Sequence, residues 1–176
     1  MIPTFRRWGA ALFLVVLACA PAFADGFEAT VTRVFDGDSF LVRPAKGKDI
    51  DVRLADIDAP EKQQPYGNDA RAALKRLIEG RRVYVDVIET DQYQRKVAHV
   101  YRLPDRLDVR RTLVHDGHVW VWRKYARDRQ LFALEDAARA AHIGIWALRE
   151  SERMPPWQFR YLERQRKNGT RSSRDH

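Results

Sequence analysis

The feature of this sequence that most constrains its fold is a series of short alternating segments separated by turn residues. "FEATVTRVF" (27–35) alternates apolar and polar positions and is rich in β-formers, and "DGD" (36–38) follows it as a tight turn. "SFLVRP" (39–44) and "IDVRLADI" (50–57) continue the alternation, with "KGK" (46–48) between them as a second turn. These segments predict a meander of three strands joined by short loops.

In the middle of the chain, the spacing of apolar residues changes from the alternation of a strand to that of a helix. "NDARAALKRLIEG" (68–80) places its apolar residues on one helical face, so we expect a helix with Asn68 as its N-cap and Gly80 at the C′ position. The alternation returns in "RRVYVDVIE" (81–89) and "KVAHVYRL" (96–103), which are the expected fourth and fifth strands.

Two more helices are expected after the fifth strand. Asp108 can cap a helix over "VRRTLVHD" that ends at Gly117, and "RQLFALEDAARAAHIG" (129–144) fits a third helix. From Glu150 onward the pattern fades into a stretch rich in Pro, Arg and Ser, where "MPPWQF" (154–159) could pack back onto the body. This order suits a mainly β protein of the α+β class, with three helices and a five-stranded oligonucleotide/oligosaccharide-binding (OB) barrel. An open α+β sheet gives a similar pattern, so periodicity alone leaves both architectures open.

The N-terminus has the pattern of an export signal. Arg6 and Arg7 precede an apolar run (8–20) that is too short to span a bilayer, and an Ala-x-Ala site ends at Ala24. We therefore expect a signal peptide over residues 1–24. Cleavage near Ala24 would release the mature protein into the periplasm or outside the cell.

Cys19 is the only cysteine of the chain, so a mature protein cleaved near Ala24 has no cysteine. Its fold must then depend on a packed core without disulfides. The letters "VLAC" before Cys19 weakly resemble a lipoprotein signal, and lipidation at Cys19 is the one route by which we expect the protein to reach a membrane.

The chain has a formal net charge of +8, and this charge is unevenly distributed. Residues 149–176 hold eight Arg or Lys against four acids, whereas residues 25–148 are nearly balanced. We divide the mature chain accordingly into one domain (25–148) and a basic C-terminal tail (149–176). Such a tail suits a polyanion such as nucleic acid or an anionic membrane surface, although a solvating tail would have the same composition.

Three polar clusters lie at predicted strand ends or in loops: "DGDS" (36–39), "RLADIDAPE" (53–61) and "TDQYQRK" (90–96). Hard cations take carboxylate, carbonyl and water oxygens as ligands, and a further carboxylate can accept a proton from an attacking water. Arginines can fork onto phosphate oxygens and stabilise the charge of a transition state. Together the clusters suit metal-assisted hydrolysis of a phosphodiester.

Each cluster also has a simpler interpretation when it is taken alone. "DGD" is most often a hairpin turn, Arg53 could pair with Asp51 or Asp56 on the surface, and Arg95 could be a solvated loop residue. Only the order and combination of the clusters favour a catalytic site.

That combination resembles the staphylococcal nuclease (thermonuclease) family. The segments that carry the resemblance are "VFDGDSFLV", "VRLADIDAPE", "YGNDA", "TDQYQRKVAHVY" and "GIW", in the order of the family and spread over about residues 27 to 147. The resemblance implies an OB barrel, Ca²⁺ as cofactor, and hydrolysis of the 5′ P–O bond in DNA or RNA to leave 3′-phosphates.

The resemblance also implies a metal site. Asp38 and Asp58 would be calcium ligands together with the backbone carbonyl of Ala59, and Asp36 would be a nearby carboxylate that does not ligate directly. Members of the family often have Thr at the position of Ala59. Because only the backbone carbonyl is expected to ligate, this departure should matter little.

The catalytic roles implied by the resemblance fall on three residues. Arg53 would bind the scissile phosphate, Glu61 would be the general base, and Arg95 would stabilise the developing charge on phosphorus. Where relatives commonly have Gly before that last arginine, this chain has Gln94, which lacks the conformational freedom of glycine and could shift Arg95.

Contacts to the nucleotide are expected from Tyr93 and Tyr125, with charge added by Lys124. Aromatic rings can stack on bases without reading sequence. For the tryptophans at positions 120, 122 and 146 we favour core packing.

With what the resemblance implies, we expect a monomeric, calcium-dependent, sugar-nonspecific nuclease that acts on DNA and RNA. The alternative from another class is an OB-fold nucleic-acid-binding module with weak or no catalysis. A degenerate module should have lost part of the implied set, and this chain retains all of Asp38, Arg53, Asp58, Glu61 and Arg95. The complete set favours the enzyme.

Overall fold

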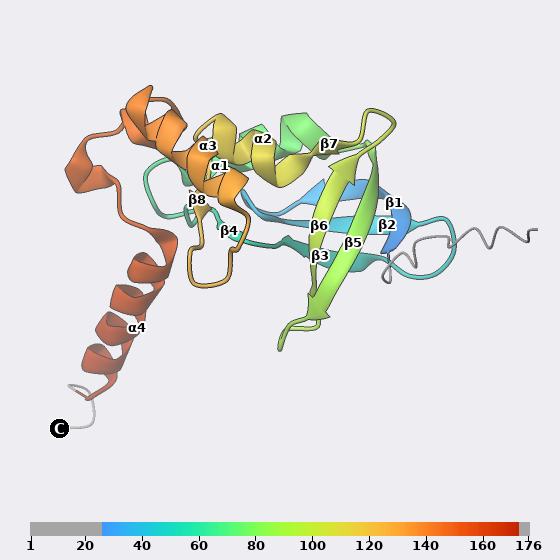
Figure 1. Ribbon diagram of the computed structural model, residues 1–176. Helices are drawn as coiled ribbons and strands as arrows, with labels where there is room; N and C mark the ends of the chain where they lie inside the picture. The colour runs from blue at the N-terminus through green and yellow to red at the C-terminus, as the bar shows by residue number, and fades with distance from the viewer. Residues whose placement is uncertain (1–25, 173–176) are drawn as a thin grey trace, which may run out of the picture.

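The computed structural model describes residues 26–172, with side chains to residue 168 (Figure 1). The predicted signal peptide, its cleavage site near Ala24 and the lipidation candidate Cys19 lie outside the described residues. Within residues 26–172, no helix has both the length and the apolar character needed to cross a membrane.

Five strands close into a barrel: β1 (Gly26–Val34), β2 (Ser39–Pro44), β3 (Ile50–Leu54), β5 (Arg82–Thr90) and β6 (Lys96–Arg102). They run in the order β3-β2-β1-β5-β6 with antiparallel neighbours, and β3 then pairs with β6 in parallel. The short β7 (Leu107–Asp108) extends the sheet beside β6. This closure confirms the predicted OB-type barrel and excludes the open sheet that periodicity had left possible.

A second, two-stranded sheet was not predicted. It consists of β4 (Ile57–Asp58) and β8 (Trp120–Val121), which pair antiparallel. The expected strand over 50–57 is therefore interrupted, because Asp56 adopts a left-handed φ of 64°. The carbonyl of Asp56 accepts a hydrogen bond from the backbone N of Trp122 at 2.8 Å, so the interruption joins the chain to the segment after β8.

Three helices, α1 (Gly67–Ile78), α2 (Val109–His115) and α3 (Arg129–Ala140), lie together on one side of the barrel (Figure 1). Asp108 caps α2 as predicted, since its side chain accepts hydrogen bonds from two backbone N–H groups of the first turn.

The ends of α1 were predicted with mixed success. Gly80 follows the helix with a φ of +74°, as expected for a C′ glycine. The assignment of Asn68 as N-cap is wrong, because the N-cap is Tyr66, two residues earlier and in a left-handed conformation, and the helix begins at Gly67. The chain can turn into the helix there because Gly67 packs against the carbonyl of Glu61, which would lie 2.1 Å from any Cβ.

The third helix ends at Ala140 and not near Gly144, where it was expected. Beyond it the chain turns through left-handed residues at His142 and Gly144, and a Cβ on Gly144 would lie 2.1 Å from the carbonyl oxygen of Gly117. The left-handed conformation of His142 cannot belong to a right-handed helix, so α3 ends before it.

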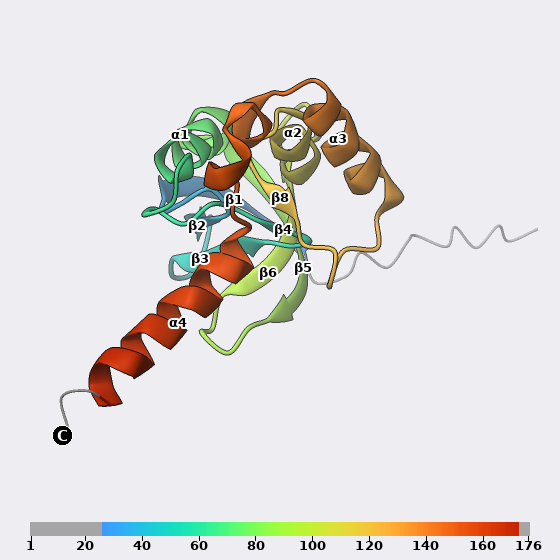
Figure 2. The same cartoon turned by 90° about the vertical axis from the view of Figure 1, so that its left-hand side faces the viewer.

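The C-terminal segment is helical, which corrects the expectation of three helices and an irregular tail. Two short 3₁₀ turns (Gly144–Ala147 and Glu150–Glu152) lead to α4 (Pro156–Ser172), the fourth α-helix within the described residues. Pro156 occupies its first position, where a missing N–H costs nothing. In both views the far end of α4 extends away from the barrel (Figures 1 and 2).

The core has two parts. The larger fills the barrel and the space beneath the helices, and Phe40, Leu54 and Leu74 are fully buried in it. The smaller contains Trp120 and Trp146, with the partly buried Trp157 of α4 packed against them. Core packing was the correct prediction for Trp120 and Trp146.

Candidate active site

The Asp36–Asp38 turn is a tight loop fixed by one carboxylate. Oδ1 of Asp36 accepts hydrogen bonds from the backbone N of Asp38 at 3.0 Å and of Ser39 at 2.7 Å. A Cβ on Gly37 would lie 2.6 Å from Cβ of Ala59 and 2.9 Å from Cβ of Ala70, so glycine lets the turn pack against both. The turn thereby brings Asp38 to the end of β4.

Asp38 is 7% exposed, and its Oδ2 accepts a hydrogen bond from the backbone N of Ala59 at 2.9 Å. Burial raises the pKa of Asp38 to about 8, the charge of Arg53 opposes this rise, and the charges of Asp36 and Asp58 add to it. A carboxyl in this position has a strong energetic need for a nearby cation.

Arg53 lies between the two aspartates implied as metal ligands. Its Nη2 donates to Oδ1 of Asp58 at 3.1 Å and lies 3.6 Å from Oδ2 of Asp38. The guanidinium also faces the ring of Trp122, 5.2 Å from its centroid. The surface pairing considered for this arginine is therefore not the one observed, and Asp56 instead contacts Arg110 at 2.6 Å.

Asp58 is 1% exposed and is held by two arginines. Besides Arg53, Arg160 of α4 approaches it with both guanidinium ends, Nη1 at 3.1 Å from Oδ1 and Nη2 at 2.7 Å from Oδ2. Burial raises the pKa of Asp58, and the contacts with Arg160 and Arg53 oppose that rise.

The strand that carries Asp58 is held in place through β8. In the β4–β8 pair Asp58 lies opposite Trp120, and the next residue, Val121, donates its backbone N–H to Oε1 of Glu135 at 2.9 Å. Glu135 is a buried residue of α3 that also binds Arg123 at 2.9 Å. Sequence reasoning missed Glu135, because a single glutamate on a helix gives no signal that it is buried.

Glu61 contacts the same arginine as Asp58. Nη1 of Arg160 donates to Oε1 of Glu61 at 2.7 Å, and the glutamate side chain is about one-third exposed. Burial works against the charge of Arg160, but its hydrogen bonds to Asp58 and Glu61 raise the pKa of the guanidinium above its ordinary value. Arg160 was also missed, although it directly follows the "MPPWQF" segment that was expected to pack back.

The loop between β5 and β6 positions Arg95 through its own residues. The carboxylate of Asp91 accepts from the backbone N of Tyr93 at 2.9 Å and of Arg95 at 3.0 Å, and it pairs with Nε of Arg95 at 2.8 Å. Gln94 adopts a φ of 65°, the left-handed conformation that glycine adopts most easily. The turn therefore forms with glutamine at that position.

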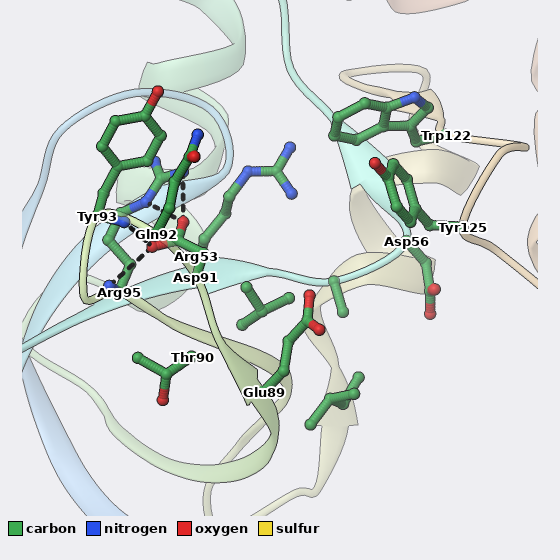
Figure 3. Close-up of a pocket in the computed structure, with 13 residues that line it drawn as sticks. Arg53, Asp56, Glu89, Thr90, Asp91, Gln92, Tyr93, Arg95, Trp122 and Tyr125 are labelled. Carbon is green, nitrogen blue, oxygen red and sulfur yellow. Dashed lines mark hydrogen bonds and ion pairs between the residues drawn. The ribbon is translucent and has the colours of Figure 1, made fainter.

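A cavity of about 550 Å³ opens beside this loop and exposes part of the predicted site (Figure 3). Tyr93 and Arg95 lie on one side of it, Trp122 and Tyr125 on the other, and the guanidinium of Arg53 points between them. Tyr93 is 70% exposed and Tyr125 is 52% exposed, so both rings are accessible to a ligand.

Not every predicted site residue lines this cavity. Lys124 lines a neighbouring cavity of about 360 Å³, and its Nζ lies 5.3 Å from the ring centroid of Tyr125. Asp38, Asp58 and Glu61, which together form the acidic cluster, do not line the cavity. Arg53 contacts the two aspartates and also lines the cavity.

The acidic residues fit a hard divalent cation only in part. Across residues 26–172, no three His, Cys, Asp or Glu side chains lie close enough to hold a metal on their own. Asp38 and Asp58 are nevertheless buried, oxygen-bearing and close to one guanidinium, and the carbonyl of Ala59 follows directly in the chain. This donor set suits an ion such as Ca²⁺ whose coordination is completed by water.

Comparisons with known proteins agree with this geometry. A family model described as "Staphylococcal nuclease homologue" matches residues 51–148. The chain is 37% identical to Protein ParB of Escherichia coli over 163 residues, which is 88% of this chain and 89% of that protein. It is 34% identical to a micrococcal nuclease of Shigella flexneri over 178 residues, 96% and 97% of the two chains. It is also 35% identical to an uncharacterized endonuclease of Escherichia coli O157:H7 over 80% of this chain and 90% of the relative.

Proposed function

The chain belongs to the staphylococcal nuclease family, and on that premise we propose that it is a calcium-dependent, sugar-nonspecific nuclease. It would hydrolyse DNA and RNA at the 5′ P–O bond and leave 3′-phosphates. The relatives support a hydrolase that acts on nucleic acid. The observation that carries the finer proposal is the position of Arg53, which links two buried carboxylates to an open, aromatic-lined cavity.

Substrate binding is assigned to the cavity. Arg53 and Arg95 both line it, and two guanidinium groups can fork onto the oxygens of one phosphate. The exposed rings of Tyr93 and Tyr125 offer stacking surfaces for the adjoining bases. Stacking does not distinguish ribose from deoxyribose, which fits an enzyme that accepts both DNA and RNA.

The chemical step needs a base and a group that stabilises charge. Glu61 is exposed enough to meet water, and its carboxylate would take the proton of the attacking water molecule. Arg53 and Arg95 would then stabilise the additional negative charge on the phosphate oxygens in the transition state.

The metal site is assigned to Asp38, Asp58 and the carbonyl of Ala59. A bound Ca²⁺ would there supply Lewis-acid stabilisation of the phosphate charge. Asp36 would contribute by holding the turn that carries Asp38, since both of its hydrogen bonds go to backbone N–H groups of that turn.

We also propose that the protein is exported as a monomer and acts in the periplasm or outside the cell. The basis for export is the pattern of residues 1–24: a pair of arginines, an apolar run and an Ala-x-Ala site. Mass determination of the mature N-terminus tests this proposal, because cleavage after Ala24 leaves a free Asp25 and lipoprotein processing leaves an acylated Cys19.

The test of the nuclease is cleavage of single-stranded DNA and of RNA, with Ca²⁺ and with a chelator, for the protein and for Glu61→Gln. We expect calcium-dependent cleavage with 3′-phosphate ends, reduced about 10²–10⁴-fold in the variant because the base is lost. Glu150→Gln, at an exposed site in a 3₁₀ turn, is the matched control and should keep full activity.

The other outcomes of this experiment are equally informative. Cleavage that persists in the presence of the chelator would contradict the assignment of Ca²⁺ as cofactor. Tight binding of DNA without cleavage under any divalent cation would leave the OB-fold binding module as the function.

A further inference from the structure

One guanidinium from the C-terminal helix reaches two carboxylates of the candidate site. Nη1 of Arg160 lies 3.1 Å from Oδ1 of Asp58 and 2.7 Å from Oε1 of Glu61, so a single nitrogen joins the two acids. Arg160 lies beyond residues 51–148, the part matched by the family model, and it is 102 positions from Asp58 in sequence.

The start of α4 is anchored by a buried side chain. Gln64 is 7% exposed; its Oε1 accepts from the backbone N of Glu61 at 2.9 Å, and its Nε2 donates to the carbonyl of Met154 at 2.7 Å. One amide therefore fixes the backbone of Glu61 relative to the segment that leads into α4. A buried amide with both ends satisfied is costly to disrupt.

Aromatic rings hold the same end of the helix. Trp157 contacts Trp120 edge-on, with 6.0 Å between ring centroids, and it lies parallel to Trp122 at 6.4 Å. Trp122 in turn faces two cations, because the guanidinium of Arg160 lies 5.7 Å and that of Arg53 5.2 Å from its ring centroid. The guanidinium of Arg160 is thus fixed by its helix, by a ring and by two carboxylates.

We propose that Arg160 is a positioning residue of the active site, which holds the carboxylate of Glu61 at a fixed place beside Asp58. The proposal rests on the function assigned above, in which Glu61 is the general base. Glu61 follows β4 in an irregular segment and its side chain is partly exposed. Without Arg160 the two carboxylates repel each other and the glutamate is free to rotate into solvent.

The anchoring favours this role over that of a removable latch. A latch would need a weakly held segment, whereas the first turn of α4 is joined to the body by Gln64 and by Trp157. The start of α4 accordingly acts on the active site as a fixed support, through Arg160.

The experiment compares Arg160→Ala and Arg160→Lys with Arg164→Ala, using the full protein, single-stranded DNA and saturating Ca²⁺. Arg164 is an exposed residue one turn further along the same helix, so its variant matches the change in charge. We expect Arg160→Ala to lower kcat about 10- to 100-fold, because small errors in the placement of a catalytic group have effects of this size. KM should change less than about threefold, and Arg160→Lys should restore part of kcat by keeping one charged contact.

A double-variant cycle with Glu61→Gln separates positioning from a general structural role. If Arg160 acts through Glu61, Arg160→Ala should lower kcat little further once Glu61 has been replaced. Independent effects that multiply would overturn the proposal. So would a rise in kcat for Arg160→Ala, which would make the arginine a blocking group, or a rise in KM alone, which would make it a phosphate contact.

The same data distinguish failure of this inference from failure of the proposed function. If Glu61→Gln keeps full activity, the assignment of the base is wrong. If Glu61→Gln is inactive and Arg160→Ala is as active as Arg164→Ala, only the role of Arg160 is wrong.

Discussion

The two halves of the candidate site are built in opposite ways. In the acidic cluster, Asp38 and Asp58 are buried and lie beside guanidinium groups supplied by β3 and α4. In the cavity, Tyr93 and Tyr125 are more than half exposed, and Arg95 is held by an aspartate of its own five-residue loop.

This difference matches two requirements of a nuclease, which are preorganised charge for the chemical step and a binding surface for a varied ligand. The cluster combines segments up to about a hundred residues apart, so its geometry depends on the whole fold and suits the chemical step, which needs preorganised charge. The loop 91–95 is held by local hydrogen bonds and presents rings to solvent, which suits binding of a varied ligand. Substitutions in the cluster should therefore act on kcat, and substitutions of the exposed aromatic rings at the cavity should act on KM.

Among the variants that compare the cluster with the cavity, the largest effect is expected from Arg53→Gln. Removal of the charge between the two carboxylates should lower kcat about 10²–10³-fold, the typical loss when one charge-stabilising donor is removed. Steady-state kinetics on single-stranded DNA measures it, and Arg81→Gln, at an exposed position before β5, is the control. A change confined to KM would erase the distinction between cluster and cavity.

A smaller effect is expected at the rim of the cavity. Tyr93→Ala should raise KM about tenfold and leave kcat nearly unchanged, because loss of one stacked base costs about 1–3 kcal/mol of binding. The comparison variant is Tyr161→Ala, which removes a similarly exposed ring from α4. If kcat fell with KM unaffected, Tyr93 would act in the chemical step and not in base stacking.

The buried cluster should also show in the pH dependence of stability. The folded-state pKa of Asp38 is raised from 3.8 to about 8, so the folded protein binds more protons than the unfolded chain between these values. Stability should therefore fall as pH rises from about 4 to about 8 in the absence of divalent cations.

Asp38→Asn should remove this contribution to the pH dependence of stability. At pH 8 the variant should be more stable than the unchanged protein by at least about 1 kcal/mol. Urea unfolding at several pH values tests this, with Asp51→Asn as the exposed control. An unchanged pH profile would mean that the carboxyl of Asp38 is already ionised in the folded protein.

The smallest effect is expected in the exposed loop. Gln94→Gly removes the strain of a glutamine in a left-handed conformation but makes the unfolded chain more flexible. The free energy of unfolding should therefore rise by less than about 1 kcal/mol. Cleavage should not decrease, since the turn already forms with Gln94. The control is Gln92→Gly, a substitution in the same loop at a residue without a positive φ, and it should be slightly destabilising. A large loss of activity in Gln94→Gly would show that the glutamine side chain itself contacts the substrate.

Most of the barrel could be predicted because its signals are local. Alternation marks the five strands, and the caps at Asp108 and Gly80 depend on neighbours within four residues. Which architecture the strands form was not decided by periodicity, since closure depends on the pairing of β3 with β6, and the resemblance to a known family supplied it.

The features that were missed depend on contacts between distant segments. The two-residue strands β4 and β8 exist only because each pairs with the other, and Glu135 is buried only because β8 packs on α3. The large apolar residues of α4 all lie in its first two turns, so no apolar periodicity runs along the whole segment, and the position of Arg160 follows from the packing of Trp157.

The arrangement of the tryptophans gives the protein an optical reporter. Four of the five tryptophans lie within the described residues, and they form one connected set in which Trp120 contacts Trp146 and Trp157, and Trp157 lies against Trp122. The fifth, Trp8, belongs to the predicted signal peptide. Near-ultraviolet emission from the mature chain therefore arises beside the acidic cluster, and a label-free titration with a cation or an oligonucleotide can follow events there without any added dye.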